Sequence, residues 1–142
     1  MKKNKHTLKP DQKKKLLSTI SSYLEQNLKE VVAAYLYGSL AAGLPFSDID
    51  LGVLIKNNLG QTLKFELDLE NRLEKIVKYS VDVRVLNGAP LSFCQNVIRH
   101  RKVILDRDPN LRADFEGQIL KQYFDFAYFQ RQYLQEVANA PV

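Results

Sequence analysis

The sequence has little cysteine, histidine or continuous apolar chain. Its single cysteine, Cys94, excludes an internal disulfide and any metal site built from several thiolates. In its apolar surroundings Cys94 is predicted to be a small buried side chain rather than a nucleophile. No run approaches the roughly 20 apolar residues that span a bilayer. The lysine-rich start is not followed by an apolar stretch, so we expect no signal peptide and a cytoplasmic protein.

Two further absences narrow the chemistry. The chain has two histidines, His6 and His100, and neither has a serine or cysteine partner in an arrangement for nucleophilic catalysis, so neither is predicted to be catalytic. The GxxxxGK[ST] pattern is missing, which excludes a Walker A phosphate loop.

Length and composition predict one domain. A chain of 142 residues with 45% apolar content can bury a real core, so we expect residues 1–142 to form a single unit, with a core at about 30–108 and a C-terminal helix at about 109–138. The formal charge is +5, and seven lysines lie in the first fifteen residues: Lys2, Lys3, Lys5, Lys9, Lys13, Lys14 and Lys15. They form either a phosphate-attracting patch or a solvated helix face. No aromatic residues interleave with them, which favours the solvated face and argues against direct nucleic-acid binding.

Apolar periodicity predicts four helices and four strands. The helices are expected at residues 10–28, 62–78, 91–99 and 109–137, and the strands at 31–37, 48–55, 80–86 and 102–107. Residues 38–47 are predicted to be a small-residue loop, and 56–60 a turn. The alternation predicts an α/β (α+β) fold, with a small mixed sheet flanked by helices.

Two aspartates interrupt the second predicted strand. Asp48 and Asp50 are two residues apart, so they share one face of the strand. The alternating apolar residues, from Ile49 to Ile55, take the other face. Two adjacent carboxylates repel each other unless a proton or a cation lies between them. Oxygen ligands suit Mg²⁺, which completes its shell with substrate phosphates. The alternative is an exposed acidic face on an edge strand.

A third acid lies on the next strand. In SVDVRVL, three valines form one face, and Asp82 and Arg84 form the other. If this strand pairs beside the strand of Asp48 and Asp50, Asp82 joins them in a two-metal phosphoryl-transfer site, where it is also placed to accept a proton. Otherwise Asp82 is an ion-pair partner of Arg84 or a surface residue.

The Gly38-Ser39 pair ends the first strand. Glycine lets the backbone approach an anion closely, and the serine hydroxyl and the following amides are donors. This is a candidate phosphate cradle, although Gly-Ser at a strand end is also a common turn.

Together these residues resemble a known family. GSLAAGLPFSDIDL resembles the nucleotidyltransferase signature of the DNA polymerase β superfamily, and most of all the minimal nucleotidyltransferases, the MNT or MntA-type proteins of bacteria and archaea. VDVRVLNGAP resembles the family's third-acid strand, and residues 101–126 resemble the C-terminal portion of the MntA group. The similarity covers about residues 30–135.

The resemblance implies an activity and a partner. Such proteins take a nucleoside triphosphate, commonly ATP, with Mg²⁺ in a two-metal site, and MntA-type members are antitoxins that add AMP to a tyrosine of a HEPN ribonuclease toxin. By this resemblance Gly38 and Ser39 hold the triphosphate, Asp48 and Asp50 ligate the metals, and Asp82 is the third ligand and activates the acceptor hydroxyl.

The chain departs from the family at one loop. Eight residues separate Gly-Ser from Asp48, fewer than is usual, and the arginine that often follows Gly-Ser is replaced by LAAG. Arg84 is a candidate for supplying the missing positive charge.

Three functions are left open: a protein adenylyltransferase, a small-molecule nucleotidyltransferase, and a non-catalytic antitoxin that acts by binding. All three acids are present, which favours catalysis. No Arg-x4–6-His ribonuclease motif is evident, so the chain is not expected to be the toxin. The last predicted helix is dense in aromatic residues, which are either a partner interface, within a homo- or hetero-oligomer, or packing against the sheet.

Overall fold

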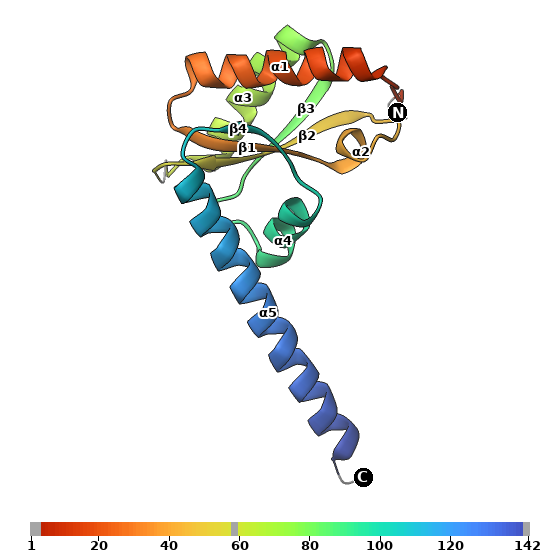
Figure 1. Cartoon of the computed structure of the whole chain (residues 1–142), viewed down its shortest axis with the longest axis vertical. Coiled ribbons are helices and arrows are strands. Elements are labelled where there is room, and N and C mark those ends of the chain that lie inside the picture. Colours follow the sequence, from red (N-terminus) through yellow and green to blue (C-terminus); the bar gives the residue numbers. More distant parts are fainter. Residues whose placement is uncertain (1–3, 58–59, 141–142) are drawn as a thin grey trace.

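The computed structural model describes residues 4–57 and 60–140. Its elements are α1 (Pro10–Asn27), β1 (Val31–Tyr37), α2 (Gly38–Ala41), β2 (Asp48–Ile55), α3 (Thr62–Val77), β3 (Ser80–Val85), α4 (Leu91–Arg99), β4 (Lys102–Asp106) and α5 (Pro109–Asn139). The strands form one sheet in the order β3-β2-β1-β4, shown in Figure 1. Strand β1 is antiparallel to both its neighbours, and β2 is parallel to β3. The predicted α/β class and its sheet flanked by helices are confirmed.

The predicted helices and strands all occur, with ends that differ by no more than two residues. The prediction of a loop after β1 is wrong for its first four residues, because residues 38–41 form the short helix α2. Gly38 has a φ of +76°, which turns the chain directly from the strand into the helix, and Leu40 is buried beneath it. The predictions for Lys2, Lys3 and residues 58–59 of the turn lie outside the described residues.

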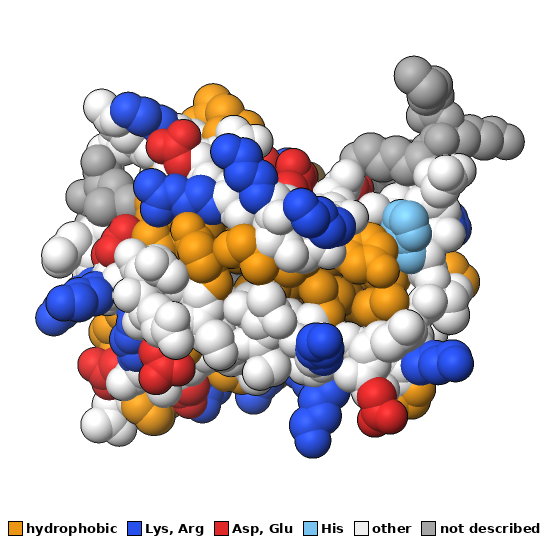
Figure 2. Space-filling model, turned by 90° about the horizontal axis from the view of Figure 1, so that it is seen from above, with side chains coloured by type: hydrophobic (Ala, Val, Ile, Leu, Met, Phe, Trp, Pro, Cys, Tyr) orange, Lys and Arg blue, Asp and Glu red, His pale blue; other side chains and the backbone are white. Residues whose placement is uncertain are grey.

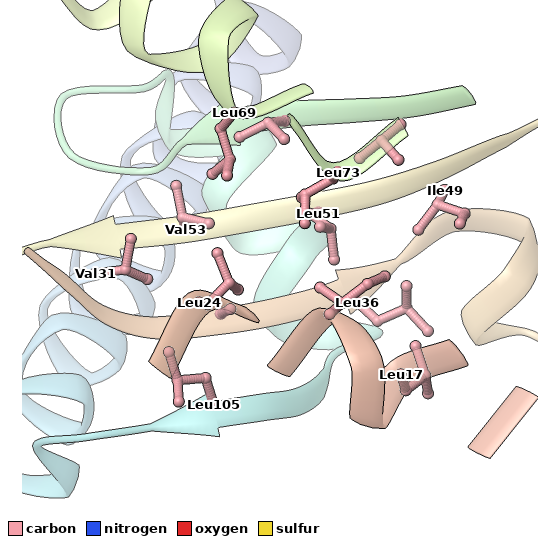
Figure 3. Packing of buried hydrophobic residues seen from close by; sticks show 14 of the residues in the cluster. Leu17, Leu24, Val31, Leu36, Ile49, Leu51, Val53, Leu69, Leu73 and Leu105 are labelled. Carbon is pink, nitrogen blue, oxygen red and sulfur yellow. The ribbon is translucent and has the colours of Figure 1, made fainter. Parts of the chain in front are cut away.

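The sheet separates two layers of helices. Helices α1 and α3 cover one face, and α4 with the start of α5 lies against the other (Figure 1). Alternate residues of β2 (Ile49, Leu51 and Val53) face α1 and α3 in the larger core cluster, shown in Figure 3. The opposite cluster is smaller and contains Cys94, which is buried as predicted. The less covered face is the one that carries the aspartates of β2.

Arg107, which directly follows β4, caps the C-terminal end of α1 with its side chain. Its guanidinium donates to the carbonyls of Leu28 (2.6 Å), Val31 (2.9 Å) and Leu24 (3.2 Å), and also to that of Glu25. The last carbonyls of a helix have no partner within the helix and carry partial negative charge, so a cation there both satisfies and neutralises them.

The first described residues brace the segment that leads into β2. His6 and Phe46 form an antiparallel bridge with two backbone hydrogen bonds, of 2.8 and 3.0 Å. The His6 ring also contacts the rings of Phe46 and Tyr79, with centroids 5.6 and 4.9 Å away. His6 therefore lies in an aromatic cluster, whereas His100 is exposed at the end of α4.

Three glutamates of α3 bind the outer edge of β3. The amides of Val81, Val83 and Val85 donate to the carboxylates of Glu74 (3.0 Å), Glu70 (2.9 Å) and Glu66 (2.8 Å), respectively. Four residues of helix rise about 6.0 Å and two residues of strand about 6.6 Å, so the two repeats stay nearly in step. The glutamate ladder (Glu66, Glu70 and Glu74) satisfies amides that an edge strand otherwise leaves open.

Helix α5 packs on the sheet only near its start. Glu116 is buried and pairs with Arg101 (2.9 Å) and Arg112 (2.9 Å), and Ile119 joins the smaller core cluster. Beyond this point the helix leaves the body (Figure 1), and it exposes the large side chains Phe124, Phe126, Tyr128, Phe129, Tyr133, Leu134 and Val137. The core-packing alternative is thus right only for the first turns. No helix within residues 4–57 and 60–140 is long and apolar enough to cross a membrane.

The Lys and Arg side chains on the α1 side of the molecule do not form a continuous basic surface. Figure 2 looks onto the α1 side of the molecule and shows Lys and Arg side chains separated by apolar, acidic and uncharged ones. This pattern is typical of the solvated helix face.

The glutamate ladder yields a test at Glu70, whose pKa is raised mainly by burial. Because the folded pKa exceeds the unfolded one, ionisation of Glu70 costs stability as pH rises through this pKa. Glu70→Gln keeps an oxygen for the Val83 amide without the charge, so it should be at least as stable as wild type at pH 7, with the difference vanishing in acid.

Glu70→Ala should lower the free energy of unfolding by about 1 kcal/mol, because the Val83 amide loses its acceptor. Chemical denaturation of both variants at pH 7 and pH 4 checks this pair. Equal destabilisation by Gln and Ala at pH 7 would contradict the role given to the hydrogen bond.

Candidate active site

The structure places the three aspartates on one face of the sheet, at the same end of β2 and β3. The parallel pairing of these strands puts Asp50 directly opposite Asp82 and Asp48 opposite Ser80. Opposed residues on paired strands project to the same side, so the expected convergence of Asp82 with the acids of β2 is confirmed as an arrangement of the chain. Their roles as metal ligands and base stay a prediction.

Gly38 lies directly against Asp50. A Cβ atom built on Gly38 would be 2.1 Å from Asp50 Oδ2, so a side chain at this position would require the carboxylate of Asp50 to move. The φ of +76° independently favours glycine at this position. Gly38 therefore serves two purposes: it turns the chain after β1, and it lets the carboxylate of Asp50 sit over the backbone.

Two hollows meet at Asp82. The larger is a cleft of about 700 Å³ between β3, α4 and the start of α3, and its lining includes Tyr37, Asp50, Asp82, Arg84 and Phe93. The smaller, of about 450 Å³, runs along β3 and the glutamate ladder and includes Asp48, Asp82 and Arg84. The larger cleft has the size of a small-molecule site.

Asp82 is paired with Arg84 on the same strand. Arg84 Nε donates to Asp82 Oδ1 at 3.2 Å, and the two side chains are 57% and 38% exposed. The ion-pair alternative for Asp82 is therefore realised, and it coexists with the position of Asp82 beside Asp50.

The acids fit a metal only in part. Among the residues that the structure describes, no three Asp, Glu, His or Cys side chains form a group that would hold an ion by themselves. Carboxylate oxygens from adjacent strands still match Mg²⁺, which takes one or two carboxylates and completes its shell with waters and substrate phosphates. The donor set therefore suits a cation that arrives together with a phosphate ligand.

Tyr37 and Phe93 are site residues that the sequence analysis missed. Their rings meet edge to face with centroids 5.7 Å apart, on the wall of the cleft. Burial, reinforced by the negative charges of Asp50 and Asp82, raises the pKa of the Tyr37 hydroxyl, so it stays protonated as a donor. The available signal was the alternation in β1, which puts Tyr37 on the face of Asp50.

Ser39 is exposed in the first turn of α2. Its carbonyl accepts from the amide of Leu44 at 2.9 Å, which closes the small-residue connection to β2. No lysine or arginine occurs between Gly38 and Ser47. Any charge attraction for an anion must come from elsewhere in the site.

The family model for polymerase beta nucleotidyltransferases matches residues 18–110. The chain belongs to this family. The matched segment contains the sheet, Gly38-Ser39 and all three aspartates. Curated protein sequences give no match to the chain.

Solved structures show the same fold at low identity. A chain in the structure of the tri-AMPylated HEPN toxin of Shewanella oneidensis in complex with MNT antitoxin matches with a TM-score of 0.69 and 21% identity, over 89% of this chain and 98% of that one. A structure of the MntA-HepT toxin-antitoxin matches at 0.68 and 21%, over 88% and 98%. A toxin-antitoxin structure with AMP-PNP matches at 0.70 and 22%, over 86% and 98%.

Two glycines with almost the same backbone conformation allow a matched test of the site. Gly43 has a φ of +75° with nothing within 4 Å of a built Cβ, whereas Gly38 has Asp50 there. Gly43→Ala should lose about 1 kcal/mol through backbone strain alone. Gly38→Ala should lose more, and it should also abolish nucleotide binding because Asp50 is displaced.

Thermal unfolding and calorimetric titration with AMP-PNP and Mg²⁺ measure both effects. If the two alanine variants had the same stability and the same affinity for AMP-PNP, the close approach of Asp50 to Gly38 would not be required for nucleotide binding.

Proposed function

We propose that this protein is a Mg²⁺-dependent nucleotidyltransferase that transfers AMP from ATP to a tyrosine hydroxyl of a partner HEPN-domain toxin, and so acts as its antitoxin. The observation that carries the proposal is the in-register pair Asp50 and Asp82, which lines a cleft in a polymerase beta family domain and has Gly38 directly against Asp50. The solved structures with a HEPN toxin and with AMP-PNP support the choice of partner and nucleotide.

The site residues take distinct roles in this reaction. Asp48, Asp50 and Asp82 would hold Mg²⁺, which would supply charge stabilisation to the phosphates when bound. Gly38 and Ser39 would hold the triphosphate through the backbone and the hydroxyl. The acceptor oxygen attacks the α-phosphorus, its proton passes to the carboxylate of Asp82, and the bond from the α-phosphorus to the bridging oxygen breaks to release pyrophosphate.

The shape of the chain favours a protein acceptor over a small molecule. The outer half of α5 exposes five aromatic side chains, among them Phe129 (69% exposed) and Tyr133 (64% exposed). Aromatic residues are enriched in interfaces and are poorly suited to water in such numbers. We take this apolar part of α5, residues 123–137, as the docking surface for the partner.

Removing one carboxylate should abolish transfer. Asp50→Asn keeps the shape of the side chain but not its charge, so AMP transfer should fall about 100-fold or more, since even indirect supports of a metal site cost 10- to 100-fold. Asp68→Asn, an exposed aspartate of α3, is the matched control and should keep full activity. Intact mass spectrometry of the HEPN partner, incubated with ATP and Mg²⁺, would show AMP-sized additions.

Each result of that experiment decides between the open functions. Additions to the partner with wild type and Asp68→Asn alone support the adenylyltransferase. A stable complex without any addition supports a non-catalytic antitoxin. Full activity of Asp50→Asn would refute the assignment of Asp50.

The docking surface is tested separately. The double variant Phe129→Ser/Tyr133→Ser should weaken binding to the HEPN partner at least about 10-fold, because aromatic anchors carry much of an interface's energy. Its melting temperature and AMP-PNP affinity should not change, since both side chains lie outside the core. Gln118→Ser, exposed on α5 but outside the docking surface, is the control. Unchanged partner affinity, measured by calorimetry, would remove α5 from the interface.

A further inference from the structure

The cleft beside Asp50 is poor in positive charge. Three carboxylates line it, from Asp50, Glu66 and Asp82, and the only cationic side chain in the lining among the described residues is Arg84. A nucleoside triphosphate is a polyanion, so it would enter a site whose own charge is unfavourable. A cation from the protein near the phosphates would offset this charge in addition to any metal.

The connection from β1 to β2 does not supply that cation. The sequence GSLAAGLPFS, residues 38–47, offers backbone amides and hydroxyls but no lysine or arginine. Arg84 is placed differently: it stands on β3, two residues after Asp82, and lines both hollows that meet there. Its guanidinium is planar and suited to binding phosphate oxygens in pairs.

Arg84 is occupied in the structure, but weakly. Its contact with Asp82 is 3.2 Å long, and the two side chains are 57% and 38% exposed. Exposed pairs of this kind are favoured by no more than about fivefold over the separated side chains. A polyanion in either hollow therefore competes easily for the guanidinium.

We infer that Arg84 is a phosphate-positioning residue that changes partner when the nucleotide binds. Without nucleotide, Arg84 neutralises Asp82 and holds it away from a metal-binding role. With a nucleoside triphosphate in the cleft, the guanidinium binds the phosphates, and Asp82 is released to join Asp50. The third carboxylate thus becomes available only when substrate is present. The inference rests on the proposed function, which supplies the triphosphate.

Removing the guanidinium of Arg84 should change the affinities for nucleotide and for free metal ion in opposite directions. Arg84→Ala should weaken binding of AMP-PNP with Mg²⁺ about 10- to 100-fold, the loss expected for hydrogen bonds to a charged group. The same variant should bind Mn²⁺ alone at least about threefold more tightly, because Asp82 no longer faces a competing cation. Arg84→Lys should fall between Ala and wild type in both measurements, since it keeps the charge but loses the planar donor pair.

Calorimetry measures the affinity for AMP-PNP with Mg²⁺. Electron paramagnetic resonance measures the concentration of free Mn²⁺, and so the affinity for that ion. Arg72→Ala, an exposed arginine of α3 that lines neither hollow, is the control and should change neither affinity. A variant that had lost structure would bind both AMP-PNP and Mn²⁺ more weakly. A lower affinity for AMP-PNP together with a higher affinity for Mn²⁺ therefore distinguishes the change of partner by Arg84 from misfolding.

Three outcomes overturn the inference. Wild-type affinity of Arg84→Ala for AMP-PNP would refute it while leaving the proposed function intact. Unchanged or weaker binding of Mn²⁺ by that variant would refute the claim that Arg84 keeps Asp82 from binding a metal ion in the absence of nucleotide. Failure of the wild-type protein to bind AMP-PNP at all would refute the proposed function, and the inference with it.

Discussion

The parallel pairing of β2 with β3 is the constraint on which the site depends. Side chains alternate along a strand, so a slip of one residue would send Asp82 to the face that α1 and α3 cover, and would bring a valine to the cleft. Only one side of β3 is paired with the sheet. The glutamate ladder holds the other side, which makes α3 both the crossover between the strands and the clamp that fixes their register.

One face of the sheet carries the larger apolar core, and the other carries the candidate site. The face toward α1 and α3 buries an almost uninterrupted apolar layer, in which a carboxylate would be costly. The other face is covered only in part, by α4 and the first turns of α5, so polar side chains there keep access to solvent. Because Asp48, Asp50 and Asp82 all project to this second face, a strongly built core and a charged site share the same strands without conflict.

The sequence was sufficient for the strands and for the face of each strand that carries the acids, since alternation is visible in the residues. The pairing of β3 with β2, on which the grouping of the acids depends, was only a condition of the prediction. It was not sufficient where the cause is tertiary. Helix α2 is too short to show a period, and Leu67 and Ile76, which fit the apolar pattern of α3, are exposed. The spacing of the glutamates in α3 is visible, but their purpose depends on amides of β3. The same limit applies to Tyr37, whose place at the cleft follows from its register with Asp50.

Arg107 has a consequence for the order in which the molecule is completed. The carbonyls at the end of α1 accept hydrogen bonds from a guanidinium that lies about 80 residues later in the chain, immediately after the last strand. During synthesis, which runs from the N-terminus, the sheet and its first helix can therefore reach their final form only once β4 has been made. All of α5 follows that point, so the growing chain can complete the sheet and its contact with α1 before its exposed aromatic helix is finished.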